Sequence, residues 1–400
     1  GSVDASVNAT ITNAITLGAD LTFTGTANLT QGTGAIALGA DRVITVNGST
    51  LTLGGVIGGS GAGFTKSGAG TLRVTAANTY SGATNLNAGT LVLVSSFFAL
   101  GGSGSTAGLF TVNGGILDAV SGGTTITNAV TLAADLNFTG SGNLTQNTGA
   151  ITLTGSRSVS VGSTAAVTFG GDVSGDTFSL TKTGTGGLHL LGVVGTGTGG
   201  VSVSAGTLRL AGINTYTGNT TLAVGAMLVA GSSTYAFGGS GSTPGTLIIN
   251  GGTLDAIVGA TITNPITLGG NLNFNGNASL TQNTGAISLG AANRSIIHSA
   301  FGSGTLTLGG VIGGDNGIGI TKQGVGTVIL AGVNTYTGGT TLTQGPLVLA
   351  SATHALGGSG GTAGTFTING GSVDASVNAT ITNAITLGTD FTFTGSANLT

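Results

Sequence analysis

The amino-acid sequence predicts an all-β protein that folds as a single-stranded parallel β-helix, or β-solenoid, with about 20 residues in each coil. Three observations lead to this fold class. The chain has 81 glycines among 400 residues and contains no glutamate and no cysteine. Its sequence repeats itself several times. Between the glycines, short stretches alternate apolar and polar residues with the period of two that is typical of β-strands.

The composition excludes several other classes of protein. Charged residues make up 5% of the chain, far below the roughly 25% of a typical globular protein, so a helical surface cannot be built. A hydrophobic content of 39% excludes a disordered chain. The net charge of −3, with basic residues scattered singly, argues against a nucleic-acid partner. No apolar stretch approaches the roughly 18 residues of a membrane span.

Internal repeats predict the organisation of the chain. The pattern Gly-x-x-Asp-Ala opens four segments, which start at Gly1, Gly115, Gly252 and Gly371. We therefore expect one continuous β-solenoid over residues 1–400. Its repeat units are residues 1–114, 115–251 and 252–370, followed by the start of a fourth unit at 371–400.

The second repeat unit is longer than the others, and its additional length corresponds to one coil. The interval from the recurring lysine to the recurring asparagine is 12 residues from Lys66 to Asn78 but 32 residues from Lys182 to Asn214. A solenoid tolerates an insertion that completes a coil, because the chain must return to the same side before stacking resumes. We therefore expect about 20 residues in a coil, roughly six coils in each shorter unit and about twenty in the chain.

The alternating pattern predicts the cross-section of each coil. In residues 21–24 and 136–139, leucine and phenylalanine alternate with threonine and asparagine. This pattern places aliphatic and phenylalanine side chains inside, with threonine, serine and asparagine outside or at the corners. No segment between the predicted strands is long and apolar enough for a crossover helix, which excludes an α/β fold.

Three stretches of the sequence resemble a known family. Each has a lysine before a glycine-rich turn, then Asn-Thr-Tyr and a further apolar strand, as in residues 320–328, 334–341 and 345–349. These stretches, around Lys66, Lys182 and Lys322, resemble the autotransporter-associated β-strand repeat. The resemblance implies a right-handed β-helix and a bacterial surface or secreted passenger protein.

Comparison between the units tests each candidate for acid chemistry. Asp20 and Asp135 lie in the same turn, but the third unit has Asn271 there, so we predict a turn role that needs no carboxylate. Four other aspartates recur in every unit, and we expect them on the outer face or at a corner, making local turn or capping contacts without a metal: Asp4, Asp118, Asp255 and Asp374. Equivalent residues six coils apart are separated by roughly 29 Å, whereas paired carboxylates need roughly 5–9.5 Å.

The recurring lysines and the histidines also indicate no reaction. Lys66, Lys182 and Lys322 each end a strand, and we interpret them as corner lysines whose stems cover apolar neighbours. The alternative is a cationic stripe that binds acidic sugars or lipids, but a spacing of roughly 29 Å exceeds the ~8 Å Debye length. No cysteine can complete a zinc site with the histidines. We therefore predict no catalytic residue, no metal site and no cofactor.

Three flat rings mark the candidates for partner contacts. Phe98, Tyr235 and His354 occupy equivalent positions, each just before a stretch rich in glycine and serine. These stretches, residues 101–108, 238–245 and 357–364, are predicted to leave the β-helix as loops. We expect the rings to pack at the loop bases, with contact to a binding partner as the alternative.

The function that the sequence favours is structural. We expect an interior segment of a giant extracellular fibre or stalk of a bacterial surface, and not an enzyme. Neither end of the sequence has a polar cap, so we expect further copies as partners, joined covalently or by end-to-end or lateral assembly. The alternatives are an adhesin passenger that binds a partner or glycan through its glycine-rich loops and, less favoured, a polysaccharide-active enzyme or an ice-binding surface.

Overall fold

Strands of two to five residues make up this protein, and each pairs in parallel with a strand about one turn away along the chain. The computed structural model describes residues 1–104, 106–120, 122–162, 164–299, 301–314 and 317–400. These residues form two units, Gly1–Thr196 and Gly197–Thr400, and contain no helix. Both units are parallel β-solenoids, with about 18 turns in total and about 21 residues per turn. The predicted fold class is confirmed, with slightly fewer and longer turns than expected.

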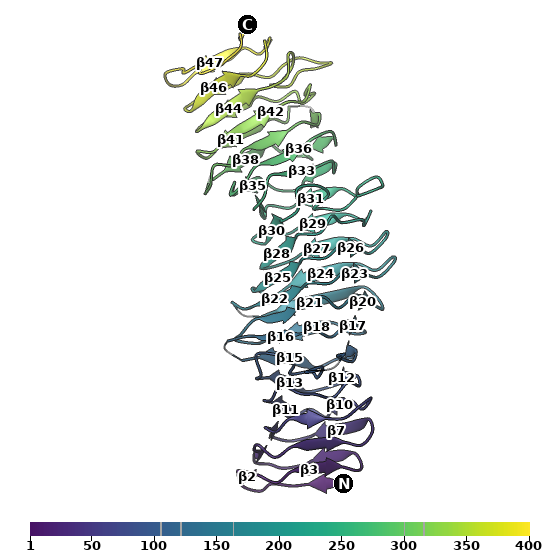
Figure 1. Cartoon of the computed structure of the whole chain (residues 1–400). Helices are drawn as coiled ribbons and strands as arrows, with labels where there is room; N and C mark the ends of the chain where they lie inside the picture. Colours follow the sequence, from purple (N-terminus) through teal and green to yellow (C-terminus); the bar gives the residue numbers. More distant parts are fainter. Residues whose placement is uncertain (105, 121, 163, 300, 315–316) are drawn as a thin grey trace. The chain divides into compact units, whose positions relative to one another are not determined.

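In the unit Gly1–Thr196, each turn visits three sides of the solenoid (Figure 1). The β1–β26 side contains β1 (Ser2–Val3), β4 (Leu21–Phe23), β7 (Arg42–Val46), β10 (Phe64–Ser67), β12 (Thr84–Leu86), β14 (Phe110–Val112), β17 (Val130–Leu132), β20 (Ile151–Leu153), β23 (Val173–Ser174) and β26 (Val194–Gly195). The β2–β24 side contains β2 (Ala9–Ile11), β5 (Leu29–Gln31), β8 (Thr50–Leu53), β11 (Thr71–Val74), β13 (Thr90–Leu93), β15 (Ile116–Ala119), β18 (Leu136–Phe138), β21 (Arg157–Val161) and β24 (Leu180–Thr183).

The third side of this unit is built in two blocks of strands. They are β3 (Ile15–Leu17), β6 (Ile36–Leu38) and β9 (Ile57–Gly58), then β16 (Thr124–Ile126), β19 (Leu144–Gln146), β22 (Ala166–Phe169) and β25 (Gly187–Leu190). Residues 78–80 and 97–98 connect the blocks. The amide of Thr79 donates to Ile57, the amide of Asn78 donates to Phe98, and Phe97 pairs with Thr125.

The unit Gly197–Thr400 also has three sides. The β27–β40 side contains β27 (Val201–Val203), β29 (Thr220–Leu222), β31 (Leu247–Ile249), β34 (Ile266–Leu268), β37 (Ile287–Ser288) and β40 (Ile312–Gly313). The β28–β47 side contains β28 (Thr207–Leu210), β30 (Met227–Ala230), β32 (Thr253–Ala256), β35 (Leu272–Phe274), β38 (Arg294–His298), β41 (Ile320–Gln323), β43 (Thr340–Leu342), β45 (Phe366–Ile368) and β47 (Ile385–Leu387). The β33–β46 side contains β33 (Ala260–Ile262), β36 (Leu280–Gln282), β39 (Leu306–Leu308), β42 (Val328–Leu330), β44 (Pro346–Leu349) and β46 (Ser372–Ala375).

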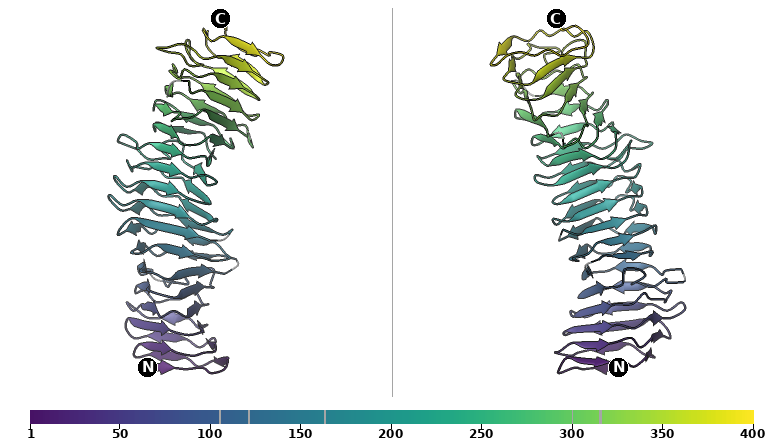
Figure 2. Two further views of the ribbon diagram at one scale, coloured as in Figure 1. Left: turned by 180° about the vertical axis from the view of Figure 1, so that it is seen from behind. Right: turned by 60° about the vertical axis from the view of Figure 1, so that its left-hand side comes forward.

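The core lies inside the turns of each unit, where equivalent side chains stack. Leu72, Leu91 and Leu117 follow one another in register in three successive turns, and each is 0% exposed. Removing each of these leucines from water contributes roughly 1.5–3 kcal/mol to stability. Within each unit the chain climbs turn by turn in sequence order, so that residues one turn apart lie on top of each other (Figure 2).

The long second repeat contains one additional turn, as predicted. One strand, β11, separates Lys66 in β10 from Asn78, and one strand, β42, separates Lys322 from Asn334. The interval from Lys182 to Asn214 instead holds four strands, β25 to β28. The three additional strands are the number in one turn, which explains why this insertion preserves the stacking.

Successive repeats open on different sides of the solenoid. β1 and β15 open the first and second repeats, yet β1 lies on the β1–β26 side and β15 on the β2–β24 side. In the other unit, β32 and β46 open successive repeats and also lie on neighbouring sides. Each repeat is therefore a whole number of turns plus one third. Equivalent residues consequently do not line up as a stripe along one side.

The placement of basic residues predicts resistance to trypsin. All eight basic residues lie within hydrogen-bonded strands: Arg42, Lys66, Arg73, Arg157, Lys182, Arg209, Arg294 and Lys322. A protease cleaves a segment that can unfold locally, and strands inside a ladder are the segments that open least. We expect the native 400-residue chain to remain uncut on denaturing gels at a trypsin dose that digests the same chain completely in urea. Early cleavage at any of these residues in the native chain would contradict the strand placement.

Candidate functional site

The three rings predicted at the loop bases share an uncommon backbone conformation. Phe98, Tyr235 and His354 have φ angles of 56°, 53° and 54°. Non-glycine residues rarely adopt this left-handed region, and the strain of about 1–3 kcal/mol persists only where the surroundings fix the conformation. All three rings are half-buried. Each of these residues lies directly before a stretch rich in glycine.

Hydrogen bonds to the carbonyl groups of the three ring residues fix the conformation. The carbonyl of Phe98 accepts the amides of Asn78 and Gly101, both at 3.0 Å. The same pair of bonds is made at 3.2 and 3.1 Å to Tyr235 and at 3.1 and 3.0 Å to His354. Three loops with the same base geometry indicate a built feature of the fold and not an irregular insertion.

Two buried asparagines fasten each loop. Asn78 donates from Nδ2 to the carbonyl of Ala99 at 2.7 Å. Asn128 donates from Nδ2 to Leu100 at 3.0 Å and to Gly108 at 2.7 Å, which holds both ends of the loop together. The equivalent asparagines in the other two loops make the same contacts: Asn214, Asn264, Asn334 and Asn383.

These asparagines do not point outward, which was one of the two orientations predicted for asparagine. Asn78 is 0% exposed and Asn128 is 1% exposed. Burying an amide costs free energy unless it is hydrogen-bonded, so each position requires the loop carbonyls beside it. The repeated Asn-Thr-Tyr and Thr-Asn words were visible in the sequence but gave no indication of this inward orientation.

Glycine is required at the start of each loop. Gly101 has a φ angle of 80°, and a Cβ atom added there would come within 2.4 Å of the Tyr80 carbonyl oxygen. The next amide, of Gly102, donates to that same carbonyl at 3.0 Å. The Tyr80 hydroxyl is in turn hydrogen-bonded to Thr84 Oγ1 at 2.6 Å inside the core. The loop thus continues the packing of the solenoid.

The recurring lysines, predicted as corner lysines whose stems cover apolar neighbours, point into the solenoid. Lys66, Lys182 and Lys322 are each 0% exposed. Lys66 Nζ donates to the carbonyls of Ser67 and Gly68 at 2.8 Å, and to Ala88 in the next turn at 2.9 Å. Burial lowers the pKa of each of these lysines to about 8. The ammonium group therefore remains charged at neutral pH and serves as an internal cap for corner carbonyls.

Three buried glutamines, which the sequence analysis did not single out, act in the same way. They end the repeated word Leu-Thr-Gln: Gln31, Gln146 and Gln282. Gln31 Oε1 accepts the amides of Gly54 and Gly55 at 3.2 and 3.1 Å, and its Nε2 donates to Asn13 and Gly34. All hydrogen-bonding directions of this amide are used on the backbone of neighbouring corners.

The recurring acids form no catalytic group. Asp20 Oδ1 accepts the amide of Val43 at 2.9 Å, and Asn271 Oδ1 accepts the equivalent amide of Ser295 at 3.0 Å. An aspartate and an asparagine therefore make the same contact, and the partner lies in the next turn and not in the same turn as predicted. Among the described residues, no group of three histidine, cysteine, aspartate or glutamate side chains could hold a metal ion.

The four aspartates of the Gly-x-x-Asp-Ala word differ in their surroundings. Asp4 is exposed and Asp118 and Asp374 are half-buried. Asp255 is only 3% exposed, which excludes the outer face of the two predicted placements, and it accepts the Ala256 amide at 2.8 Å. Its Oδ2 also accepts a hydrogen bond from the Asn277 side chain one turn later. Burial raises the pKa of Asp118, against the opposing charge of Arg73.

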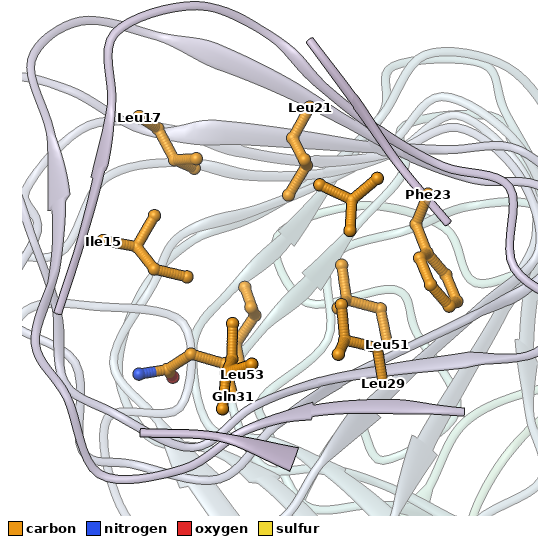
Figure 3. A pocket seen from close by; sticks show the side chains of 10 residues that line it. Ile15, Leu17, Leu21, Phe23, Leu29, Gln31, Leu51 and Leu53 are labelled. Carbon is orange, nitrogen blue, oxygen red and sulfur yellow. The ribbon is translucent and has the colours of Figure 1, made fainter. Parts of the chain in front are cut away.

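An apolar pocket lies inside the first turns of the unit Gly1–Thr196 (Figure 3). It is lined by inward-facing side chains such as Ile15, Leu17 and Phe23. The one polar lining side chain, Gln31, is already hydrogen-bonded to the backbone. The pocket is the interior of the solenoid and offers no polar group to orient a ligand.

A different kind of hollow opens at the first glycine-rich loop. Phe98 lines it together with residues of the loop and of the following turn: Gly102, Gly104, Thr106, Ala107 and Thr127. Phe97, beside it, is 57% exposed, and the two ring centroids are 6.5 Å apart. The structure does not bring Tyr235 and His354 together. Within the unit Gly197–Thr400, Thr234 pairs with β33 on the β33–β46 side, whereas the segment of His354 follows β40 on the β27–β40 side.

Comparison with known proteins supports the predicted resemblance. The family model described as the passenger-associated-transport-repeat matches residues 64–93, 180–210, 205–229 and 320–349. These segments contain the buried lysines and the Asn-Thr-Tyr words. The "Adhesin BmaC autotransporter" of Brucella suis biovar 1 (strain 1330) is 33% identical over 340 residues. No solved structure matches the chain.

The chain spans only a small part of that relative. The aligned region is 84% of this chain and 8% of the Brucella protein. The matches place the chain at the bacterial cell surface or outside the cell, as predicted. No helix among the described residues is long and apolar enough to cross a membrane.

One buried histidine makes the stability of the unit Gly197–Thr400 sensitive to acid. His298 in β38 is 0% exposed, at the inward position that Val46 and Val161 occupy in the other repeats. Its Nδ1 lies 2.9 Å from the Thr327 carbonyl, but its buried Nε2 has no hydrogen-bond partner. Burial lowers the pKa of His298 from 6.5, the bond to Thr327 opposes this, and the charge of Lys322 lowers the pKa further.

We predict that this histidine destabilises the fold below pH 6.5. The folded pKa is lower than the unfolded one, so the unfolded chain binds the proton more readily and stability falls as the pH drops through 6.5. His298→Val should remove this pH-dependent loss of stability. Its denaturation midpoint should therefore fall less between pH 8 and pH 5 than the midpoint of the parent chain. Ile297→Val, which changes the outward-facing neighbour in the same strand, is the control and should keep the full loss. Equal acid sensitivity of the parent chain and His298→Val would contradict the assignment.

Proposed function

We propose that this chain, a β-solenoid whose repeats match the passenger-associated-transport-repeat, forms a structural segment of a long adhesin-like passenger on a bacterial surface. In this role the solenoid is a stalk that carries binding regions away from the cell. The segment is not an enzyme. Further copies of the repeat lie in the same polypeptide and lengthen the stalk.

The observation that carries this proposal is the use of the recurring polar side chains. Lys66, Asn78 and Gln31 are all buried and hydrogen-bonded to the backbone of their own or a neighbouring turn. A catalytic site needs polar groups that converge on a space where a substrate can react. These recurring lysine, asparagine and glutamine side chains instead converge on the protein's own backbone, which supports a role in maintaining length and shape.

The comparison with the Brucella adhesin supports the same proposal. The aligned region is 8% of that protein, so a solenoid of this kind can be one part of a much longer chain. A parallel solenoid lends itself to lengthening, since each added turn stacks on the last and stability is a sum of repeat and interface terms. Adhesion through the loops is the second candidate function, because the described loops present half-buried rings at the surface.

Changing the number of repeats in the full-length protein tests the stalk function. Deleting residues 115–251 joins Gly114 to Gly252. Gly252 begins the same Gly-x-x-Asp-Ala pattern as Gly115, so the strands that follow can stack as they do after Gly115. The deletion removes between six and seven turns, and at ~4.8 Å per turn we expect the passenger to become shorter by roughly 30 Å. Duplicating residues 252–370 should lengthen it by a similar amount.

The measurement is the height of the surface layer on whole cells by electron cryotomography, together with adherence. Equal surface labelling with an antibody shows that each variant is exported and folded. A height that follows the number of repeats, with adherence kept when the repeat is removed, supports the stalk role. Unchanged height in both variants would contradict it.

A further inference from the structure

The loop at Phe98 differs from the other two loops at one outward-facing position. Phe97, Thr234 and Thr353 occupy this position, and each makes the same parallel pairing, to Thr125, Thr261 and Thr380 respectively. Two of the three loops therefore fold with a threonine here. Nothing in the shared backbone geometry requires a phenylalanine, and a ring that is 57% exposed gains little from burial.

Phe97 and Phe98 together form an aromatic surface beside an open hollow. Their rings are tilted by 44° with centroids 6.5 Å apart. Phe98 forms part of the wall of the hollow, and Thr106 and Thr127 contribute hydroxyl groups to it. Its other described lining residues are Gly102, Gly104 and Ala107, so backbone groups are accessible and none of the described lining side chains is charged.

This combination of groups matches the chemistry of an uncharged sugar. A pyranose has a face of C–H groups that packs on an aromatic ring and a rim of hydroxyl groups that hydrogen-bond to threonine and to the backbone. The absence of lysine, arginine and aspartate from the lining disfavours acidic sugars and phosphate, which need a cationic partner. The hollow is open, whereas small-molecule sites enclose most of their ligand, so it suits one sugar of a longer chain.

We propose that the Phe97–Phe98 surface and its hollow bind an uncharged glycan. The inference rests on the proposed function as a segment of an adhesin-like passenger and adds a ligand class and a site to it. Phe97 sets the specificity, since the other two loops share a threonine at this outward-facing position. Those two rings have a structural role in fixing the loop base.

The loops themselves supply the variants for a test. Phe97→Thr introduces the residue found at Thr234 and Thr353, so the variant retains a side chain that this backbone already carries elsewhere. Thr234→Phe places a second aromatic pair beside Tyr235. Phe98→Tyr introduces the ring that the second loop carries and keeps the stacking surface.

The experiment titrates the 400-residue chain with uncharged oligosaccharides, namely cellopentaose, chitotetraose, maltopentaose and lacto-N-tetraose, by saturation-transfer NMR and calorimetry. Sialyllactose and a heparin tetrasaccharide are the charged comparisons. We expect at least one uncharged oligosaccharide to bind one site and to receive saturation from phenylalanine ring protons. Phe97→Thr should weaken binding at least tenfold with an unchanged melting temperature, Phe98→Tyr should keep it, and Thr234→Phe should raise the stoichiometry to two.

Two results would overturn the proposal. One is that none of the uncharged oligosaccharides binds the parent chain, and the other is that affinity is the same in Phe97→Thr. A chain that binds only the charged oligosaccharides would equally refute it. These outcomes leave the stalk function intact, because the height of the repeat-deletion and repeat-duplication variants tests that function without any ligand.

Discussion

The corners of the solenoid set the constraint on which the rest of this structure depends. Strand ladders pair the backbone groups along each side, but a chain that turns three times in about 21 residues leaves amides and carbonyls at the corners. Leaving such groups buried without a partner costs roughly 1–3 kcal/mol each. The chain satisfies them with polar side chains that point inward: Lys66 for carbonyls, Gln31 for both carbonyls and amides, and Asn78 for the loop base.

This use of polar residues also determines where function can lie. The polar side chains common to the repeats hold one turn to the next. A polar residue that recurs in this protein therefore indicates a structural role. A binding site is better sought where the repeats differ, as at Phe97 against Thr234. Because each repeat ends one third of a turn further round, equivalent loops in the unit Gly197–Thr400 face different sides. A flat partner therefore cannot contact both of those loops at once.

The sequence was sufficient to predict the solenoid and the additional turn, because period-two alternation and the 20-residue insertion follow from geometry alone. The sequence did not predict the buried polar residues, because a polar side chain is ordinarily expected to face outward whatever its place in the alternating strand. Lys66 has the same parity as Phe64 in its strand, and Gln31 has the same parity as Leu29, which indicates an inward side chain in each case. The rotation by one third could not be predicted, since turn length varies. Phe64 pairs with Thr84 after 20 residues, but Thr84 pairs with Phe110 after 26, where a loop is included.

Hydrogen exchange at the corner amides tests most directly whether inward-pointing polar side chains hold the turns together. Gln282 Oε1 accepts the Gly310 amide at 2.9 Å, and Thr281 in the same strand faces outward. We expect the Gly310 amide of the parent chain to exchange as slowly as strand amides. The same amide should exchange at least tenfold faster in Gln282→Leu but not in Thr281→Leu. Rapid exchange of Gly310 in the parent chain, or equal exchange in the two variants, would contradict this expectation.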